Sequence, residues 1–128
     1  MDGYCVERRV YWRYDLPQDF TGELKRKATL LETCTVTINL LEVLEMVVTA
    51  WVMLELGGDR SAFDGNPVLM RGGNVAAVSW VSPCGGERDK RAGLLMRMLG
   101  RLEIKGRWSH IAKHISDVEN TLAAGISR

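Results

Sequence analysis

The 128-residue sequence lacks the features that mark secreted and zinc-binding proteins. Its three cysteines, Cys5, Cys34 and Cys84, are widely spaced and include none of the close Cys or Cys/His pairs that zinc sites use. We expect reduced thiols in an intracellular protein, cytoplasmic or nuclear. The first residues contain no long apolar segment, which predicts a chain without a secretory signal.

Neither a long hydrophobic run nor an excess of charge is present. The most apolar run, from Val43 to Leu56, contains Glu45, Thr49 and Glu55 and is shorter than the roughly 20 residues that a membrane span needs. Lys and Arg number 17 against 16 Asp and Glu, so the whole-chain charge indicates neither a polyanion-binding protein nor an acidic tail. We therefore expect no contact with a membrane.

The spacing of apolar residues and chain breakers predicts a single α/β domain over residues 1–128. The first long helix begins near Ile38, with Thr37 or Asn39 as its N-cap, and ends at the glycine pair after Leu56. The full predicted order is strands within 4–14, a helix over 38–57, a strand over 67–71, helices over 74–80 and 87–105, a strand over 108–115, and a C-terminal helix from 116.

Two of these helices carry candidate core and site residues. In the helix over 38–57, helical spacing predicts a buried stripe from which Glu42 and Glu45 lie aside. That stripe consists of Leu40, Leu41, Leu44, Val47, Val48, Trp51 and Val52. In the helix over 87–105, the predicted apolar face is Leu95, Met98, Leu99 and Leu102, and the adjoining basic face is Lys90, Arg97, Arg101 and Lys105. A basic face suits contact with phosphates, and an ordinary solvated helix face is the alternative.

Five segments in order resemble the ribonuclease H domain that follows reverse transcriptase in retroelement polyproteins. They are GYCVERRVYWRYDLP, INLLEVLEMVVTAW, VLMRGGNVAAVSWV, RDKRAGLLMRMLGRLE and HIAKHISDVENTLAAGISR. In that family the third segment usually contains Gly-Asp-Asn-x-x-Ala, and the last contains Asn-x-x-Ala-Asp-x-x-Ser-Arg. Gly73 and Ala124 stand where those two aspartates would be.

The resemblance implies metal-dependent cleavage of RNA–DNA hybrids in active relatives, where four acids hold two Mg²⁺ ions. Of the four positions, only the second is clearly acidic here, as Glu42, while the third and fourth are Gly73 and Ala124. The first acid belongs to a strand that would precede Gly3, and Asp2 is a poor substitute for it. Since one carboxylate cannot hold two metal ions, we expect no metal and no small-molecule cofactor.

The remaining candidates each have an ordinary structural interpretation. Glu42 is either a residual ligand or a solvated helix residue. His114 resembles the family's loop histidine near the scissile phosphate, and it could also pair with His110 at a metal, an idea that fails if the segment is a strand. Asn74 and Asn120 either orient neighbours at a site or simply cap helices.

The fold implied by the resemblance is an α/β, ribonuclease H-like mixed sheet flanked by helices and lacking its first, central strand. We expect either direct closure of the N-terminal hairpin onto the strand at 67–71, or exposed sheet edges. The expected function is a retrotransposon-derived remnant of a reverse transcriptase without nuclease activity. One alternative is an active nuclease that uses Glu42 with Asp2 or Asp117. The other is a module that binds RNA–DNA hybrid, another nucleic acid or a protein partner through the basic face.

Overall fold

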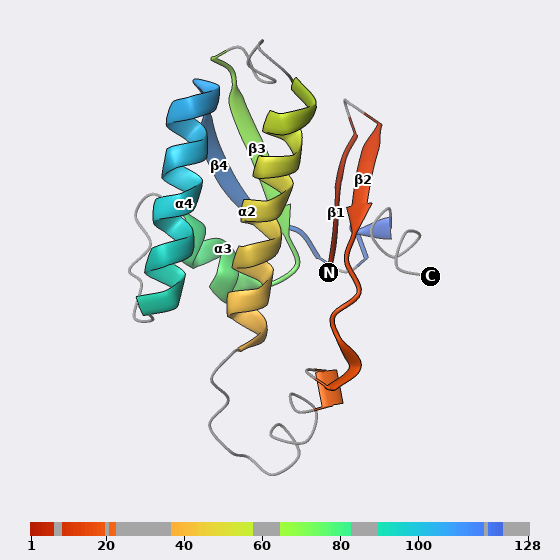
Figure 1. The fold of residues 1–128 in the computed structure, drawn as a ribbon. Coiled ribbons are helices and arrows are strands. Elements are labelled where there is room, and N and C mark those ends of the chain that lie inside the picture. The colour runs from red at the N-terminus through yellow and green to blue at the C-terminus, as the bar shows by residue number, and fades with distance from the viewer. Residues whose placement is uncertain are drawn as a thin grey trace.

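The computed structural model describes residues 1–6, 9–19, 21–22, 37–57, 65–82, 90–116 and 118–121, and its ribbon is drawn in Figure 1. Within these residues the elements follow the predicted order, which confirms a mixed α/β architecture. They are β1 (Asp2–Cys5), β2 (Val10–Arg13), α2 (Ile38–Gly57), β3 (Pro67–Gly72), α3 (Val75–Val81), α4 (Lys90–Gly106) and β4 (Ser109–His114).

The described strands form two separate two-stranded sheets. β1 and β2 are an antiparallel hairpin, in which Gly3 lies opposite Trp12, whereas β3 and β4 run parallel, with Gly72 opposite His114. No described strand joins the hairpin to β3, so the expectation of direct closure is wrong. In Figure 1, α2 and α4 lie beside each other in front of β3 and β4, and the hairpin lies on the side of α2 away from α4.

Helix α2 begins and ends close to the predicted positions, but its buried face is different. Thr37 Oγ1 accepts a hydrogen bond from the Leu40 N–H (3.3 Å), which identifies Thr37 as the N-cap. The fully buried residues are Leu40, Val43, Met46, Val47, Ala50, Met53 and Leu54. The predicted stripe was therefore wrong in part: Leu41, Leu44, Val48 and Val52 are only half-buried, and Trp51 is exposed. Because α2 contacts elements on several sides, a single-stripe pattern does not describe it.

Helix α4 packs against α2 through small and apolar residues. Leu99 is fully buried, and Leu95, Met96 and Leu102 pack against the same core. The prediction that Met98 belongs to the apolar face is wrong, because its side chain is 43% exposed.

The hairpin packs on α2 through a polar contact at a glycine. Trp12 Nε1 donates a hydrogen bond to Thr49 Oγ1 (2.9 Å), and Thr49 in turn donates to the Glu45 carbonyl (2.8 Å). A Cβ on Gly3 would collide with both Thr49 and Trp12. Glycine at this position therefore lets β1 approach the helix closely, and the same contact fixes which face of the hairpin is turned toward α2.

Candidate functional site

The carboxyl ends of the parallel strands β3 and β4 bring Gly73 and His114 together. The Ile115 N–H donates to the Gly72 carbonyl (3.0 Å), which continues the parallel pairing past the last strand residues. His114 Nε2 donates to the Gly73 carbonyl (3.0 Å), and the side chain remains exposed. In open α/β sheets, ligands bind outside the carboxyl ends of strands, so this edge is where a site would be sought.

Asn74 links this edge to the start of α2. Its Oδ1 accepts from the Ala77 N–H (3.0 Å), which makes Asn74 the N-cap of α3, as its interpretation as a cap predicted. Its Nδ2 donates to Asn39 Oδ1 (2.8 Å) in the first turn of α2. Glu42 follows Asn39 by three residues, which places it one helical turn further along. The structure thus joins the turn that holds Gly73 and Asn74 to the first turn of α2, one turn before Glu42.

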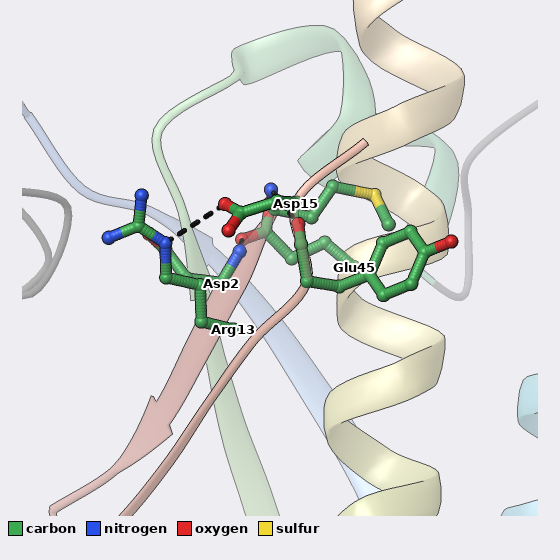
Figure 2. A network of polar contacts seen from close by, with 6 residues as sticks. Asp2, Arg13, Asp15 and Glu45 are labelled. Atoms are coloured by element: carbon green, nitrogen blue, oxygen red, sulfur yellow. Dashed lines mark hydrogen bonds and ion pairs between the residues drawn. The ribbon is translucent and has the colours of Figure 1, made fainter. Parts of the chain in front are cut away.

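Two half-buried carboxylates on α2 lie near the start of β1. Burial raises the pKa of Glu42, and the nearby charge of Asp2 raises it further. The Asp2 N–H donates to Glu45 Oε1 at 2.9 Å, and Figure 2 shows the two residues side by side. Burial raises the pKa of Glu45 to about 7; the hydrogen bond from Asp2 opposes this rise, and the charges of Glu42 and Asp2 add to it.

These residues do not make a donor set for two Mg²⁺ ions. Mg²⁺ prefers oxygen ligands in octahedral geometry, and Gly73 has no side-chain oxygen. Among the described residues, no group of three or more His, Cys, Asp or Glu side chains is arranged to hold a metal ion. Ala124 and Asp117 lie outside the described residues. The described part of the chain therefore does not fit the two-metal centre that the resemblance implies for active relatives.

The two histidines of β4 do not form a metal pair. Residues four apart in a strand are separated by roughly 13 Å. The His110 side chain is 7% exposed and contacts Glu103 Oε1 through Nδ1 (2.6 Å) and the Val81 carbonyl through Nε2 (2.7 Å), whereas His114 contacts Gly73. His110 therefore joins α4, α3 and β4, and its place is structural.

The four predicted basic residues lie exposed along α4. They recur at positions 90, 97, 101 and 105, which fall on one side of a helix. Lys105 Nζ also contacts Glu55 Oε1 on α2 at 3.6 Å, an exposed ion pair. Leu94 and Ile104 are exposed on the same side, so the face is basic but interrupted by apolar side chains.

The prediction missed the participation of Glu45 and the closure of the C-terminal turn. Glu45 follows Glu42 by three residues, the spacing that puts two carboxylates on one helix side, and this was the available signal. Beyond β4, Ser116 Oγ donates to Glu119 Oε2 (2.9 Å), and Tyr4 Oη donates to Asn120 Oδ1 (3.3 Å). Hydrogen bonds from Ser116 lower the pKa of Glu119. Asn120 therefore attaches the segment after β4 to the hairpin.

Comparison with protein-family models, with curated proteins and with solved structures finds no match to this chain. In the part of the chain that the structure describes, no helix has the length and apolar character needed to cross a membrane. Cys5 is half-buried, and Cys34 and Cys84 fall outside the described ranges.

Proposed function

We propose that this chain is a degenerate ribonuclease H-like domain, derived from a retroelement reverse transcriptase, without nuclease activity. The observation that carries the proposal is the position of Gly73. It follows β3 at the carboxyl edge of the parallel pair and contacts His114 through its carbonyl, yet it supplies no side-chain ligand. A carboxylate at that edge is what two-metal hydrolysis of a phosphodiester would require.

The arrangement of elements supports this origin. A hairpin, a long helix carrying Glu42, a strand ending at Gly73, two helices and a second parallel strand ending at His114 follow the order that the resemblance implies. The two sheets meet α2 without pairing with each other, as a ribonuclease H-like sheet without its central strand would.

The proposal is tested by a cleavage assay on a labelled RNA–DNA hybrid. The purified chain is incubated with Mg²⁺ or Mn²⁺, beside Glu42→Gln and a mock preparation from cells without the gene. We expect cleavage at the mock level in all three. Metal-dependent cleavage that is abolished by Glu42→Gln would overturn the proposal.

One observation favours the rival function of an active nuclease. Asp2, the substitute acid considered from the sequence, lies close enough to Glu42 and Glu45 for its charge to raise the pKa of both. Three carboxylates are thus near one another, although they do not form a group that could hold a metal ion. Asp2→Asn in the same assay separates the two functions, since only the rival predicts that this change removes activity.

The alternative of a nucleic-acid-binding module is supported by the exposure of Lys90, Arg97, Arg101 and Lys105. Binding of this kind would be weak and independent of sequence, because Lys and Arg on a helix face contact phosphates. The partner would be an RNA–DNA hybrid or another nucleic acid. A binding assay at low salt tests this function without requiring any cleavage.

A further inference from the structure

The edge of β1 that is turned away from β2 has main-chain groups available for pairing. Met1 and Tyr14 exchange two main-chain hydrogen bonds, Tyr14 N–H to the Met1 carbonyl (2.9 Å) and the Met1 amino group to the Tyr14 carbonyl (3.0 Å). Antiparallel pairs alternate, so Gly3 bonds to β2, whereas the main-chain groups of Asp2 and Tyr4 point the other way. The Asp2 N–H is taken by Glu45. The main-chain N–H and C=O groups of Tyr4 have no hydrogen-bond partner among the described residues.

The edge of β3 that is turned away from β4 is open in the same manner. The Gly72 carbonyl accepts from the Ile115 N–H, and in a parallel ladder this directs the main chain of every second residue, Gly72, Met70 and Val68, toward β4. The N–H and C=O groups of Leu69 and Arg71 therefore point outward. No described residue is bonded to them.

Helix α2 holds these two edges near each other. A Cβ on Gly3 would collide with Thr49, and a Cβ on Gly72 would collide with Met46, so each strand approaches α2 at a glycine. Met46 and Thr49 are three residues apart, a separation of roughly 5–6 Å between Cβ atoms. Two strands with one strand between them lie about 9–10 Å apart, twice the ordinary spacing. The contacts of α2 with both strands are compatible with that separation.

We propose that the edges of β1 and β3 form a binding site for an extended segment of another polypeptide, which pairs with both as one added strand. Figure 1 shows β1 and β3 running in opposite directions. A segment between them is therefore parallel to one and antiparallel to the other, whichever way it runs. Pairing of an added strand through main-chain hydrogen bonds is a general mode of peptide recognition.

The side chains beside the site define the chemistry of the segment. On the α2 side, Met46 lies against β3 and Thr49 lies against β1, which favours apolar and small side chains at alternate positions of the segment. At the end near Asp2, the carboxylates of Glu42 and Glu45 have no ion pair among the described residues, so a Lys or Arg of the segment is complementary there. The same carboxyl groups disfavour phosphates, so a polypeptide suits this site better than a nucleic-acid strand.

The site is tested with a capped seven-residue peptide that alternates Val and Thr between two terminal Lys residues. Amide hydrogen exchange of the full chain is followed with and without a saturating amount of this peptide. We expect exchange at Tyr4, Leu69 and Arg71 to slow at least tenfold. The control peptide has the same sequence with alternate amides N-methylated, which removes its donors along one edge, and it should bind at least tenfold more weakly.

Two variants of the chain distinguish binding at this site from nonspecific binding of the peptide. Leu69→Pro removes an outward N–H of β3 and should weaken binding at least tenfold, whereas Tyr11→Pro, on the outer edge of β2, should leave it unchanged. If Leu69→Pro unfolds, the comparison of the two peptides on the unmodified chain decides. The proposal is overturned if the peptide does not slow amide exchange, or if it slows exchange at only one of the two edges. It is also overturned if the N-methylated control peptide slows exchange equally. Protection that appears without peptide and grows with protein concentration assigns the edges to a second copy of the chain, and overturns the choice of occupant.

Discussion

The main-chain N–H of Asp2 donates a hydrogen bond to Glu45 Oε1 at 2.9 Å, which joins the first strand to the middle of α2. This bond brings a half-buried carboxylate to a strand edge where a neighbouring strand would otherwise accept from the same N–H. Burial is the largest cause of the raised pKa of Glu45, and the hydrogen bond from Asp2 lowers that pKa by less than burial raises it.

Glu45 should make the fold less stable as pH rises through neutrality. Its pKa is about 7 in the folded chain against an ordinary value of 4.5, so the folded state binds the proton more tightly. The resulting stabilisation is complete below pH 4.5 and is lost as pH rises toward 7. When solvent screening is allowed for, the free energy of unfolding falls by an amount on the order of 2 kcal/mol.

The measurement is urea unfolding of Glu45→Gln and the unmodified chain between pH 4.5 and 8. The free energy of unfolding of the variant should equal that of the unmodified chain at pH 4.5 and exceed it at pH 8. The reason is that Gln still accepts the hydrogen bond from Asp2 but carries no charge. Asp15→Asn, which alters an exposed carboxylate paired with Arg13, is the matched control. Parallel curves for Glu45→Gln and the unmodified chain would contradict the prediction.

Gly3 and Gly100 should respond in opposite ways to the same change. Gly3→Ala places a methyl group against Thr49 and Trp12, which we expect to destabilise the chain by about 1–3 kcal/mol. Gly100→Ala meets nothing within 4 Å in α4 and should stabilise it by about 0.5–1 kcal/mol, because alanine favours a helix over glycine. Thermal unfolding of both variants checks the pair. Equal effects would show that the approach of β1 to α2 is not close.

The elements themselves were predictable, because each has a local signal. Alternating residues before Pro17, the apolar run after Thr37 and the glycine pair at the end of β3 all coincide with observed strands, helix and turn. Asn74 as a cap also followed from its residue type. Long-range packing had no such signal. The buried face of α2 depends on which neighbours cover it, and α2 contacts α3, α4, β1 and β3.

The candidate site was predictable only where residue type carried the chemistry. Gly73 and Glu42 were identified from the sequence, and the structure links the turn after β3 to the start of α2 through Asn74 and Asn39. The bond from Asp2 to Glu45 joins residues 43 apart in the chain, and nothing in the sequence near either residue indicates it. The same limit applies to His110, whose partners Glu103 and Val81 come from two other elements.

Glu103 should be needed for the packing of β4 on α4. Its Oε1 accepts from the His110 N–H (2.9 Å) and contacts His110 Nδ1 (2.6 Å), while the imidazole is buried. Glu103→Ala leaves these groups without a partner and should cost about 1–3 kcal/mol. Glu55→Ala breaks only the exposed pair with Lys105 and should cost under about 1 kcal/mol. Chemical unfolding compares the two, and a Glu103→Ala cost no larger than that of Glu55→Ala would refute the role.

Restoring two acids should not restore nuclease activity. Gly73→Asp and Ala124→Asp together would return the side chains that the resemblance assigns to the third and fourth positions. The first acid of the family pattern would still be absent, so we expect hybrid cleavage to stay weak. The assay compares this double variant with and without Glu42→Gln. Strong, Glu42-dependent cleavage by the double variant would mean that Asp2 or another acid completes a metal site.

Nucleic-acid binding, where it occurs, should depend on the exposed basic residues of α4 and on salt. Alanine at Lys90, Arg97, Arg101 and Lys105 removes up to four phosphate contacts, which should flatten the fall of log K with log salt by up to about 3–4 units. Lys105 contributes less than the others because it contacts Glu55.

Arg13→Ala, in the hairpin and paired with Asp15, is the control and should leave the slope unchanged. Binding to a labelled RNA–DNA hybrid is measured by fluorescence anisotropy from about 25 to about 200 mM salt, a range over which the screening length falls roughly threefold. If the fourfold variant and the unmodified chain have the same binding constant for the hybrid, the basic face of α4 is excluded as the binding surface. Absence of binding at the lowest salt favours a remnant that retains neither cleavage nor affinity.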